Sequence, residues 1–208
     1  MIDKQTCALL IVDIQNDFCP NGHLAVAEGD LVIPIVNQLT NQFDIIVQTQ
    51  DWHPAEHLSF ASNHDNKSPY DVVDLNGVQQ VLWPDHCVQG SSGAEFHPDL
   101  NTQPATLCIR KGMNPQIDSY SAFLENDKQT RTGLDGYLKD LGIKEVYLVG
   151  LATDYCVLFS ALDAVDLGYK THVIIDACRG VDVPEGNVDK ALATMKEKGI
   201  RILQSADI

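Results

Sequence analysis

The segment EVYLVGLATDYCVLFSAL, residues 145–162, contains the strand-to-helix junction that decides the fold. Residues 145–149 show the short apolar and β-branched pattern that is typical of a strand buried on both faces. From 154 to 167 apolar residues recur at helical spacing, at Val157, Ala161, Ala164 and Val165. A buried strand that leads straight into a helix is the repeating unit of a parallel α/β sheet.

The same alternation of strand and helix patterns extends along the chain in both directions from this segment. Further strands are predicted at 9–12, 44–49, 106–109, 172–175 and 201–203, and further helices at 29–41, 132–141 and 188–198. Parallel sheets with right-handed crossover helices carry their sites at the carboxyl ends of the strands. We therefore expect functional residues near positions 13, 51, 110 and 150.

The composition predicts one globular domain over residues 1–208 and disfavours several kinds of partner. The chain is 44% hydrophobic and 21% charged, and its length is close to that of one domain of about 150 residues. A formal net charge of −15 is unfavourable for binding to nucleic acid or to anionic membrane surfaces. The sequence begins with no pattern of a secretory signal, so the six cysteines are expected to be reduced thiols in a cytoplasmic protein.

One long segment, 51–104, lacks regular periodicity and is predicted to be a loop that carries the site. Loops of this length in compact domains are usually functional or disordered, and aromatic-rich loops are seldom disordered. Both tryptophans and four of the seven histidines fall between residues 51 and 86 of this segment. One of the two tryptophans, Trp83, could hold a flat aromatic ligand together with Phe18.

Three residues at the ends of predicted strands form a candidate thiol site. Cys156 lies in the first turn of a helix, where free N–H groups and the positive end of the helix dipole favour a thiolate and can hold an oxyanion. Asp13 can accept the thiol proton, and the cation of Lys111 can stabilise the thiolate. Together they predict a cysteine nucleophile with a carboxylate base.

A second group of residues predicts a metal site close to the first. Asp51 and His53 stand two positions apart just beyond a strand, and His86 follows in the same loop. Two imidazoles and one carboxylate, with open positions for water, suit Zn, Fe or Mn. His57 is either a further ligand or a hydrogen-bonding scaffold residue, with the scaffold role favoured. Whether Ser59 is a ligand is likewise left open.

Five motifs along the chain resemble those of a known family. LLIVDIQNDF, QTQDWHP, WPDHCVQG, RKG and GLATDYCV occur in this order between residue 8 and about residue 180. They are similar to the signature segments of the nicotinamidases, within the isochorismatase-like cysteine hydrolases. The resemblance implies a three-layer Rossmann-like α/β fold, with a six-stranded, mainly parallel sheet and helices on both faces. It also implies hydrolysis of nicotinamide to nicotinate and ammonia through a cysteine thioester, in NAD salvage, with pyrazinamide as a further substrate.

The resemblance also implies roles for individual residues. The catalytic residues would be Asp13, Lys111 and Cys156, and the ligands of one divalent metal ion, with zinc favoured over iron or manganese, would be Asp51, His53 and His86. A cis peptide between Leu151 and Ala152 would aim the N–H groups of Ala152 and Cys156 at the oxyanion. The substrate-binding residues would be Phe18, Trp83, Tyr120, Leu151 and Tyr155.

Two alternative functions are weighed against this one. Another amidohydrolase of the same superfamily would act on a carbamoyl or ureido substrate, which the metal motif and Trp83 disfavour. A thiol redox sensor without catalytic activity would use Cys156 as the sensing group, which Asp13 and Lys111 disfavour. The expected partner is a small-molecule substrate, and the chain is compatible with a homo-oligomer.

Overall fold

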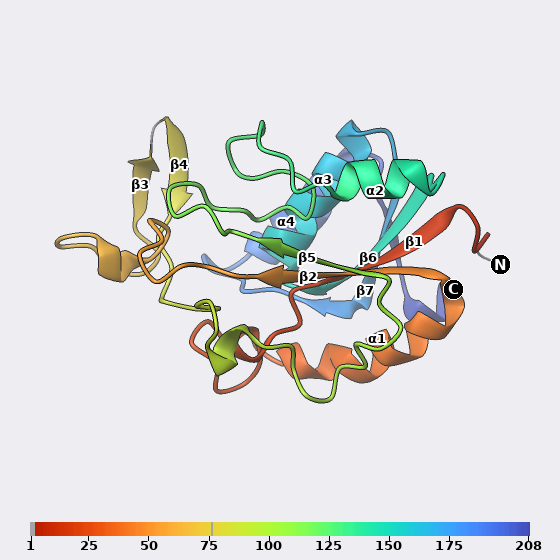
Figure 1. The fold of residues 1–208 in the computed structure, drawn as a ribbon, viewed down its shortest axis with the longest axis horizontal. Helices are drawn as coiled ribbons and strands as arrows, with labels where there is room; N and C mark the ends of the chain where they lie inside the picture. Colours follow the sequence, from red (N-terminus) through yellow and green to blue (C-terminus); the bar gives the residue numbers. More distant parts are fainter. Residues whose placement is uncertain (1–2, 76) are drawn as a thin grey trace.

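A six-stranded parallel sheet forms the centre of the protein. The structure, a computed structural model, describes residues 3–75 and 77–208. The strands are β1 (Cys7–Val12), β2 (Ile45–Asp51), β5 (Leu107–Lys111), β6 (Glu145–Leu151), β7 (Lys170–Arg179) and β8 (Arg201–Leu203). They lie in the order β5-β2-β1-β6-β7-β8, and every neighbouring pair is parallel. The predicted α/β fold with a six-stranded parallel sheet is therefore confirmed (Figure 1).

Helices cover both faces of the sheet because the central strands are apolar on both. Alternate side chains of β1 belong to two different clusters of buried residues, with Ala8 and Leu10 in one and Leu9 and Ile11 in the other. The first cluster includes residues of α2 (Leu134–Asp140), α3 (Leu158–Asp166) and α4 (Asn187–Glu197), and the second includes residues of α1 (Ile33–Leu39). Figure 1 shows α1 on one side of the sheet and the other three helices on the opposite side.

The predicted strands and helices are all present, with shifted ends. The helix predicted at 29–41 consists of α1 between two short 3-10 turns, Gly29–Val32 and Thr40–Gln42. The helix predicted at 154–167 begins with a π-helical turn, Thr153–Val157, before the regular turns of α3. Among the described residues, none of the helices has both the length and the apolar character needed to cross a lipid bilayer.

The segment predicted as one long loop contains a hairpin that the sequence analysis missed. Strands β3 (Val72–Leu75) and β4 (Val78–Val81) pair in antiparallel fashion, apart from the central sheet. Isolated bridges join His53 to Val88 and Phe60 to Trp83, so the rest of the segment folds back on itself. In Figure 1 the hairpin stands beyond the carboxyl ends of β2 and β5. The segment is therefore an ordered cap at the end of the sheet where the predicted site lies.

Candidate active site

The three residues of the predicted thiol site meet at the carboxyl ends of three parallel strands of the sheet. Lys111 is the last residue of β5, Asp13 follows β1, and Cys156 lies in the turn after β6. The Nζ atom of Lys111 is 2.9 Å from Oδ2 of Asp13 and 3.6 Å from Sγ of Cys156. The order of the strands thus brings together residues that are up to 143 positions apart in the sequence, from 13 to 156.

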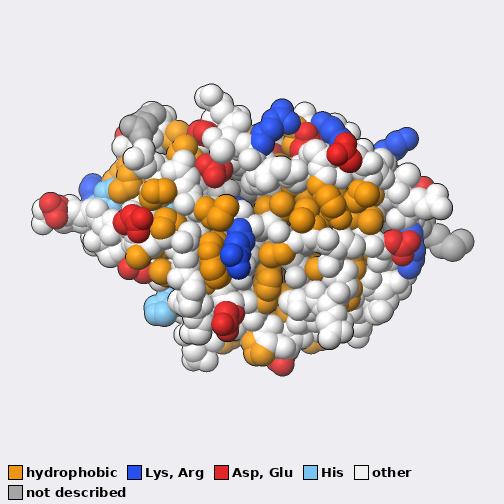
Figure 2. Space-filling model, in the orientation of Figure 1, with side chains coloured by type: hydrophobic (Ala, Val, Ile, Leu, Met, Phe, Trp, Pro, Cys, Tyr) orange, Lys and Arg blue, Asp and Glu red, His pale blue; other side chains and the backbone are white. Residues whose placement is uncertain are grey.

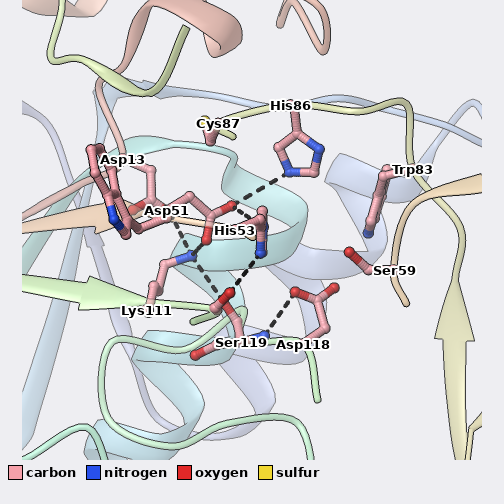
Figure 3. A network of polar contacts seen from close by, with 12 residues as sticks. Asp13, Asp51, His53, Ser59, Trp83, His86, Cys87, Lys111, Asp118 and Ser119 are labelled. Carbon is pink, nitrogen blue, oxygen red and sulfur yellow. Dashed lines mark hydrogen bonds and ion pairs between the residues drawn. The ribbon is translucent and has the colours of Figure 1, made fainter. Parts of the chain in front are cut away.

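Lys111 is the central charge of the site. Its side chain has no exposed surface, and Nζ also lies 2.7 Å from Oδ1 of Asp51 and donates to the carbonyl of Ser119 at 2.9 Å. Burial alone would lower the pKa of Lys111, but the carboxylates of Asp13 and Asp51 raise it well above its ordinary value. The residue is therefore a fixed ammonium ion shared by two carboxylates (Figure 3).

Asp13 is held as a hydrogen-bond acceptor inside the protein. The hydroxyl of Thr49 donates to Oδ1 of Asp13 at 2.6 Å, and the backbone N–H of Asp13 donates to the same hydroxyl at 3.2 Å. Complete burial raises the pKa of Asp13, against the opposing effect of Lys111. A carboxylate with a raised pKa is a stronger proton acceptor than an ordinary aspartate, as a general base requires.

The expected lowering of the thiol pKa is not found. Burial raises the pKa of Cys156 well above its ordinary value, and the charges of Asp13 and Asp51 raise it further, while Lys111 lowers it. The sequence-based expectation counted the helix terminus and one cation, but it did not count the loss of water around the sulfur or two neighbouring carboxylates. The resting form of Cys156 is therefore the neutral thiol.

Asp51, His53 and His86 form a compact group that is suited to a metal ion. Oδ2 of Asp51 lies 3.2 Å from Nε2 of His53 and 3.5 Å from Nε2 of His86. The other ring nitrogens point to backbone carbonyls, with Nδ1 of His53 2.9 Å from Gly112 O and Nδ1 of His86 2.8 Å from Pro84 O. Backbone contacts of this kind fix the tautomer that presents Nε2 to a metal. The donor set therefore fits one divalent cation, as predicted.

His57 lies beside this group with a different set of contacts. Its Nδ1 is 2.7 Å from the hydroxyl of Ser59 and accepts from the backbone N–H of Ser59 at 3.1 Å. Its Nε2 has no hydrogen-bond partner among the described residues, and with His53 and Asp118 it forms a second group of possible ligands. Burial lowers the pKa of His57 to about 4, so the ring is neutral. The bond to Ser59 agrees with a scaffold role.

A small cavity opens onto the sulfur of Cys156. Four of the five predicted substrate-binding residues line it, namely Phe18, Trp83, Tyr120 and Tyr155, and so do Asp51, His86 and Ala152. Leu151 is fully buried and is not among the lining residues. The structure also contains the cis peptide between Leu151 and Ala152 that the resemblance implied. The cavity is small, about 30 Å³, and is partly open to solvent.

Three further residues line the cavity although the sequence did not indicate them: Leu24, Asp118 and Val181. Asp118 is buried within the irregular segment between β5 and α2 and carries no motif that would have singled it out. A larger hollow of about 510 Å³ lies at the amino-terminal end of the strands, beside Glu145, Lys170 and His172. It contains none of the predicted site residues, so the chemistry is concentrated in the small cavity.

Comparisons with known proteins agree with this geometry. The family described as "Isochorismatase domain" matches residues 7–207. A curated nicotinamidase from Acinetobacter baylyi is 52% identical over 208 residues, which is 100% of this chain and 97% of the relative. A solved nicotinamidase and pyrazinamidase from Acinetobacter baumannii superposes with a TM-score of 0.97, at 54% identity over 99% of both chains. A pyrazinamidase from Pyrococcus horikoshii, solved in complex with zinc, has a TM-score of 0.77 at 38% identity, over 95% of this chain and 98% of the other.

Proposed function

This chain belongs to the isochorismatase family, and we propose that it hydrolyses nicotinamide to nicotinate and ammonia, and also accepts pyrazinamide. The observation that carries the chemistry is the distance of 3.6 Å between Lys111 Nζ and Cys156 Sγ at the wall of the cavity. A cysteine beside a buried cation and a buried carboxylate is equipped for nucleophilic attack on an acyl carbon. The reaction would return nicotinamide to NAD synthesis.

The first half of the reaction forms a thioester. Asp13 accepts the proton of the Cys156 thiol, and the sulfur attacks the carboxamide carbon, with Lys111 stabilising the developing negative charge of the thiolate. The N–H groups of Ala152 and Cys156 hold the oxyanion of the tetrahedral intermediate. The bond to nitrogen then breaks, and Asp13 gives its proton to the leaving amide nitrogen, which departs as ammonia.

The second half releases the acid. A water molecule enters the position that ammonia has left, and Asp13 takes one of its protons as the oxygen attacks the thioester carbon. The bond between carbon and sulfur breaks, and the proton returns from Asp13 to the sulfur of Cys156. The acid that forms loses its remaining proton to solvent and leaves as nicotinate. Asp13 thus serves as base and then acid in each half, and Lys111 keeps its charge throughout.

Binding of the ring is assigned to the walls of the cavity and to the metal group. Phe18, Trp83, Tyr120 and Tyr155 offer aromatic surfaces to a flat ring. Asp51, His53 and His86 would hold one divalent ion, zinc by preference, which supplies a Lewis-acid position for orienting the ring nitrogen. Aromatic walls of this kind favour a flat aromatic amide over a carbamoyl or ureido substrate.

The test is the release of ammonia from nicotinamide by the wild-type protein and by Cys156→Ala. The wild type should turn over, and the variant should fall to background. Cys108→Ala removes an exposed thiol of the edge strand β5 and is the matched control that should keep full activity. An inactive wild type would refute the assignment, and a fully active Cys156→Ala would refute the thiol mechanism.

We also propose a cytoplasmic location, because all six cysteines are free thiols. The partner is the small-molecule substrate, and assembly into a homo-oligomer remains a prediction. Size-exclusion chromatography with light scattering would measure the assembly state.

A further inference from the structure

One side chain of the β3–β4 hairpin is turned into the protein. Gln80, in β4, is only 2% exposed, whereas its neighbour Gln79 is exposed and donates to Asp74 of the same hairpin at 3.0 Å. Neighbouring residues of a strand point to opposite faces, so the two glutamines differ in their surroundings and not in their chemistry. A buried amide needs hydrogen-bond partners, and those of Gln80 lie outside the hairpin or at its end.

The amide nitrogen of Gln80 faces three oxygen atoms. Nε2 donates to the carbonyl of Val81 at 2.7 Å and to Oδ2 of Asp118 at 2.8 Å, and lies 3.2 Å from the hydroxyl of Tyr120. The carbonyl and the carboxylate can only accept, which fixes the NH₂ end of the amide toward them. Gln80 itself is not among the residues that line the cavity, but Asp118 and Tyr120 are.

The hydroxyl of Tyr120 extends this connection to the aromatic wall. It accepts from the indole Nε1–H of Trp83 at 3.1 Å. The ring of Trp83 in turn packs edge-to-face against Tyr155, with the ring centroids 4.8 Å apart. One amide of the hairpin is therefore connected by hydrogen bonds to Asp118, Tyr120 and Trp83, which all line the cavity.

We propose that Gln80 is a positioning residue that sets the aromatic wall of the substrate cavity and so determines how tightly the ring of the substrate is bound. The inference rests on the proposed function and identifies the hairpin as part of the substrate site. Without Gln80, the carboxylate of Asp118 would still accept a hydrogen bond from the backbone N–H of Ser119 at 2.8 Å, but it would have lost its other donor. A buried carboxylate with fewer donors recruits water or changes its position. Tyr120 loses a donor at the same time, so the wall loses its fixed shape.

The experiment compares Gln80→Met with Gln79→Met as a matched control. Methionine keeps the length of glutamine but has no hydrogen-bond donor. At position 79 it removes only the surface hydrogen bond to Asp74. Nicotinamide turnover gives KM and kcat separately. Alkylation of Cys156 by iodoacetamide without substrate, followed by mass spectrometry of its peptide, reports whether the thiol is still reactive.

Gln80→Met should raise KM about tenfold, the effect of one lost hydrogen bond to a charged group. We expect kcat to stay within about twofold, because uniform binding affects KM alone. The alkylation rate should not fall, because Cys156 itself is untouched. Gln79→Met should match the wild type in all three. Any of three results would overturn the inference: an unchanged KM, with or without a lower kcat; a slower alkylation of Cys156; or an equal effect of Gln79→Met.

A second variant decides the matter if Gln80→Met does not fold. Tyr120→Phe removes the hydroxyl through which Gln80 reaches Trp83, and it should show the same rise in KM with little change in kcat. An unchanged KM in that variant would overturn the inference. A wild-type protein that does not hydrolyse nicotinamide would instead refute the proposed function, so the two failures are distinguishable.

Discussion

The substitution Lys111→Met removes the positive charge that pairs with Asp13 of the thiol site and with Asp51 of the metal group. Methionine has a similar length and is uncharged, so the change leaves the packing nearly intact and deletes the ammonium group. Two buried carboxylates, those of Asp13 and Asp51, then face each other across the vacated position without a cation. The consequence should be measurable in both stability and activity.

The magnitude follows from the burial and the distances. Lys111 has a side-chain exposure of 0% and pairs with Asp13 at 2.9 Å and with Asp51 at 2.7 Å. Breaking a buried ion pair by removing one partner costs about 3–5 kcal/mol. For a chain of this length 1 kcal/mol shifts Tm by about 2–4 °C, so the melting temperature should fall by roughly 6–20 °C. The same energy, if lost from the thiolate, lowers kcat about a thousandfold.

Calorimetry and ammonia release measure the two effects, with the metal present at the same concentration in all samples. Lys170→Met is the matched control, because Lys170 pairs with Glu145 at 2.9 Å on the surface, where its side chain is 54% exposed. An exposed pair contributes less than about 1 kcal/mol, so the control should melt and turn over like the wild type. The double variant Lys111→Met/Asp13→Asn should be less destabilised than Lys111→Met, because one uncompensated charge is gone.

Two outcomes would refute this reasoning. If Lys111→Met melts within about 2 °C of the wild type, the ion pairs with Lys111 do not offset the free-energy cost of burying the two carboxylates. If kcat falls less than about tenfold, the ammonium group does not stabilise the thiolate.

Three further predictions concern other parts of the site. Gly112→Ala should lower the bound metal content measured by atomic absorption, because a Cβ there would lie 2.4 Å from the His53 ring, at a backbone φ of +66°; an unchanged content would contradict this. Burial and the charge of Asp127 raise the pKa of Glu125 from 4.5 to about 7, so the native state loses stability as the pH rises through that range. Glu125→Gln should therefore stabilise the protein at pH 8 by about 1–2 kcal/mol. In denaturant titrations this gain should disappear near pH 4. Chelation of the metal should raise KM for nicotinamide, with recovery on adding zinc back; an unchanged KM would exclude ring orientation by the ion.

The parts of the site that lie on regular strands could be predicted from the sequence. Asp13, Lys111 and Cys156 each follow or end an apolar strand, and parallel strands place such residues at one edge of the sheet. Asp51 was found by the same rule, because it ends β2. The order β5-β2-β1-β6 then makes these residues neighbours, although pattern alone does not reveal which strands are adjacent.

The parts that depend on the irregular segment could not be predicted in the same way. Gln80 reaches the site through the path of the chain between β2 and β5, and Asp118 through the segment between β5 and α2. No periodicity describes either path. Leu151 was assigned to the substrate site by the resemblance, but it is fully buried and does not line the cavity. A motif specifies which residues are near a site, whereas the backbone conformation decides which side chains face it.

The pKa of the nucleophile depends on the charge balance of the whole buried group, which a single neighbouring cation does not describe. Lys111 carries one positive charge and is shared between the carboxylates of Asp13 and Asp51, so it is not free to stabilise a thiolate at rest. Burial therefore dominates, and the pKa of Cys156 is raised. When the thiol proton moves to Asp13, however, one negative charge replaces another beside the same ammonium ion, and the total charge of the buried group does not change. The site thus avoids the cost of creating a new charge away from water, and Cys156 needs Asp13 as an acceptor more than it needs a low pKa of its own.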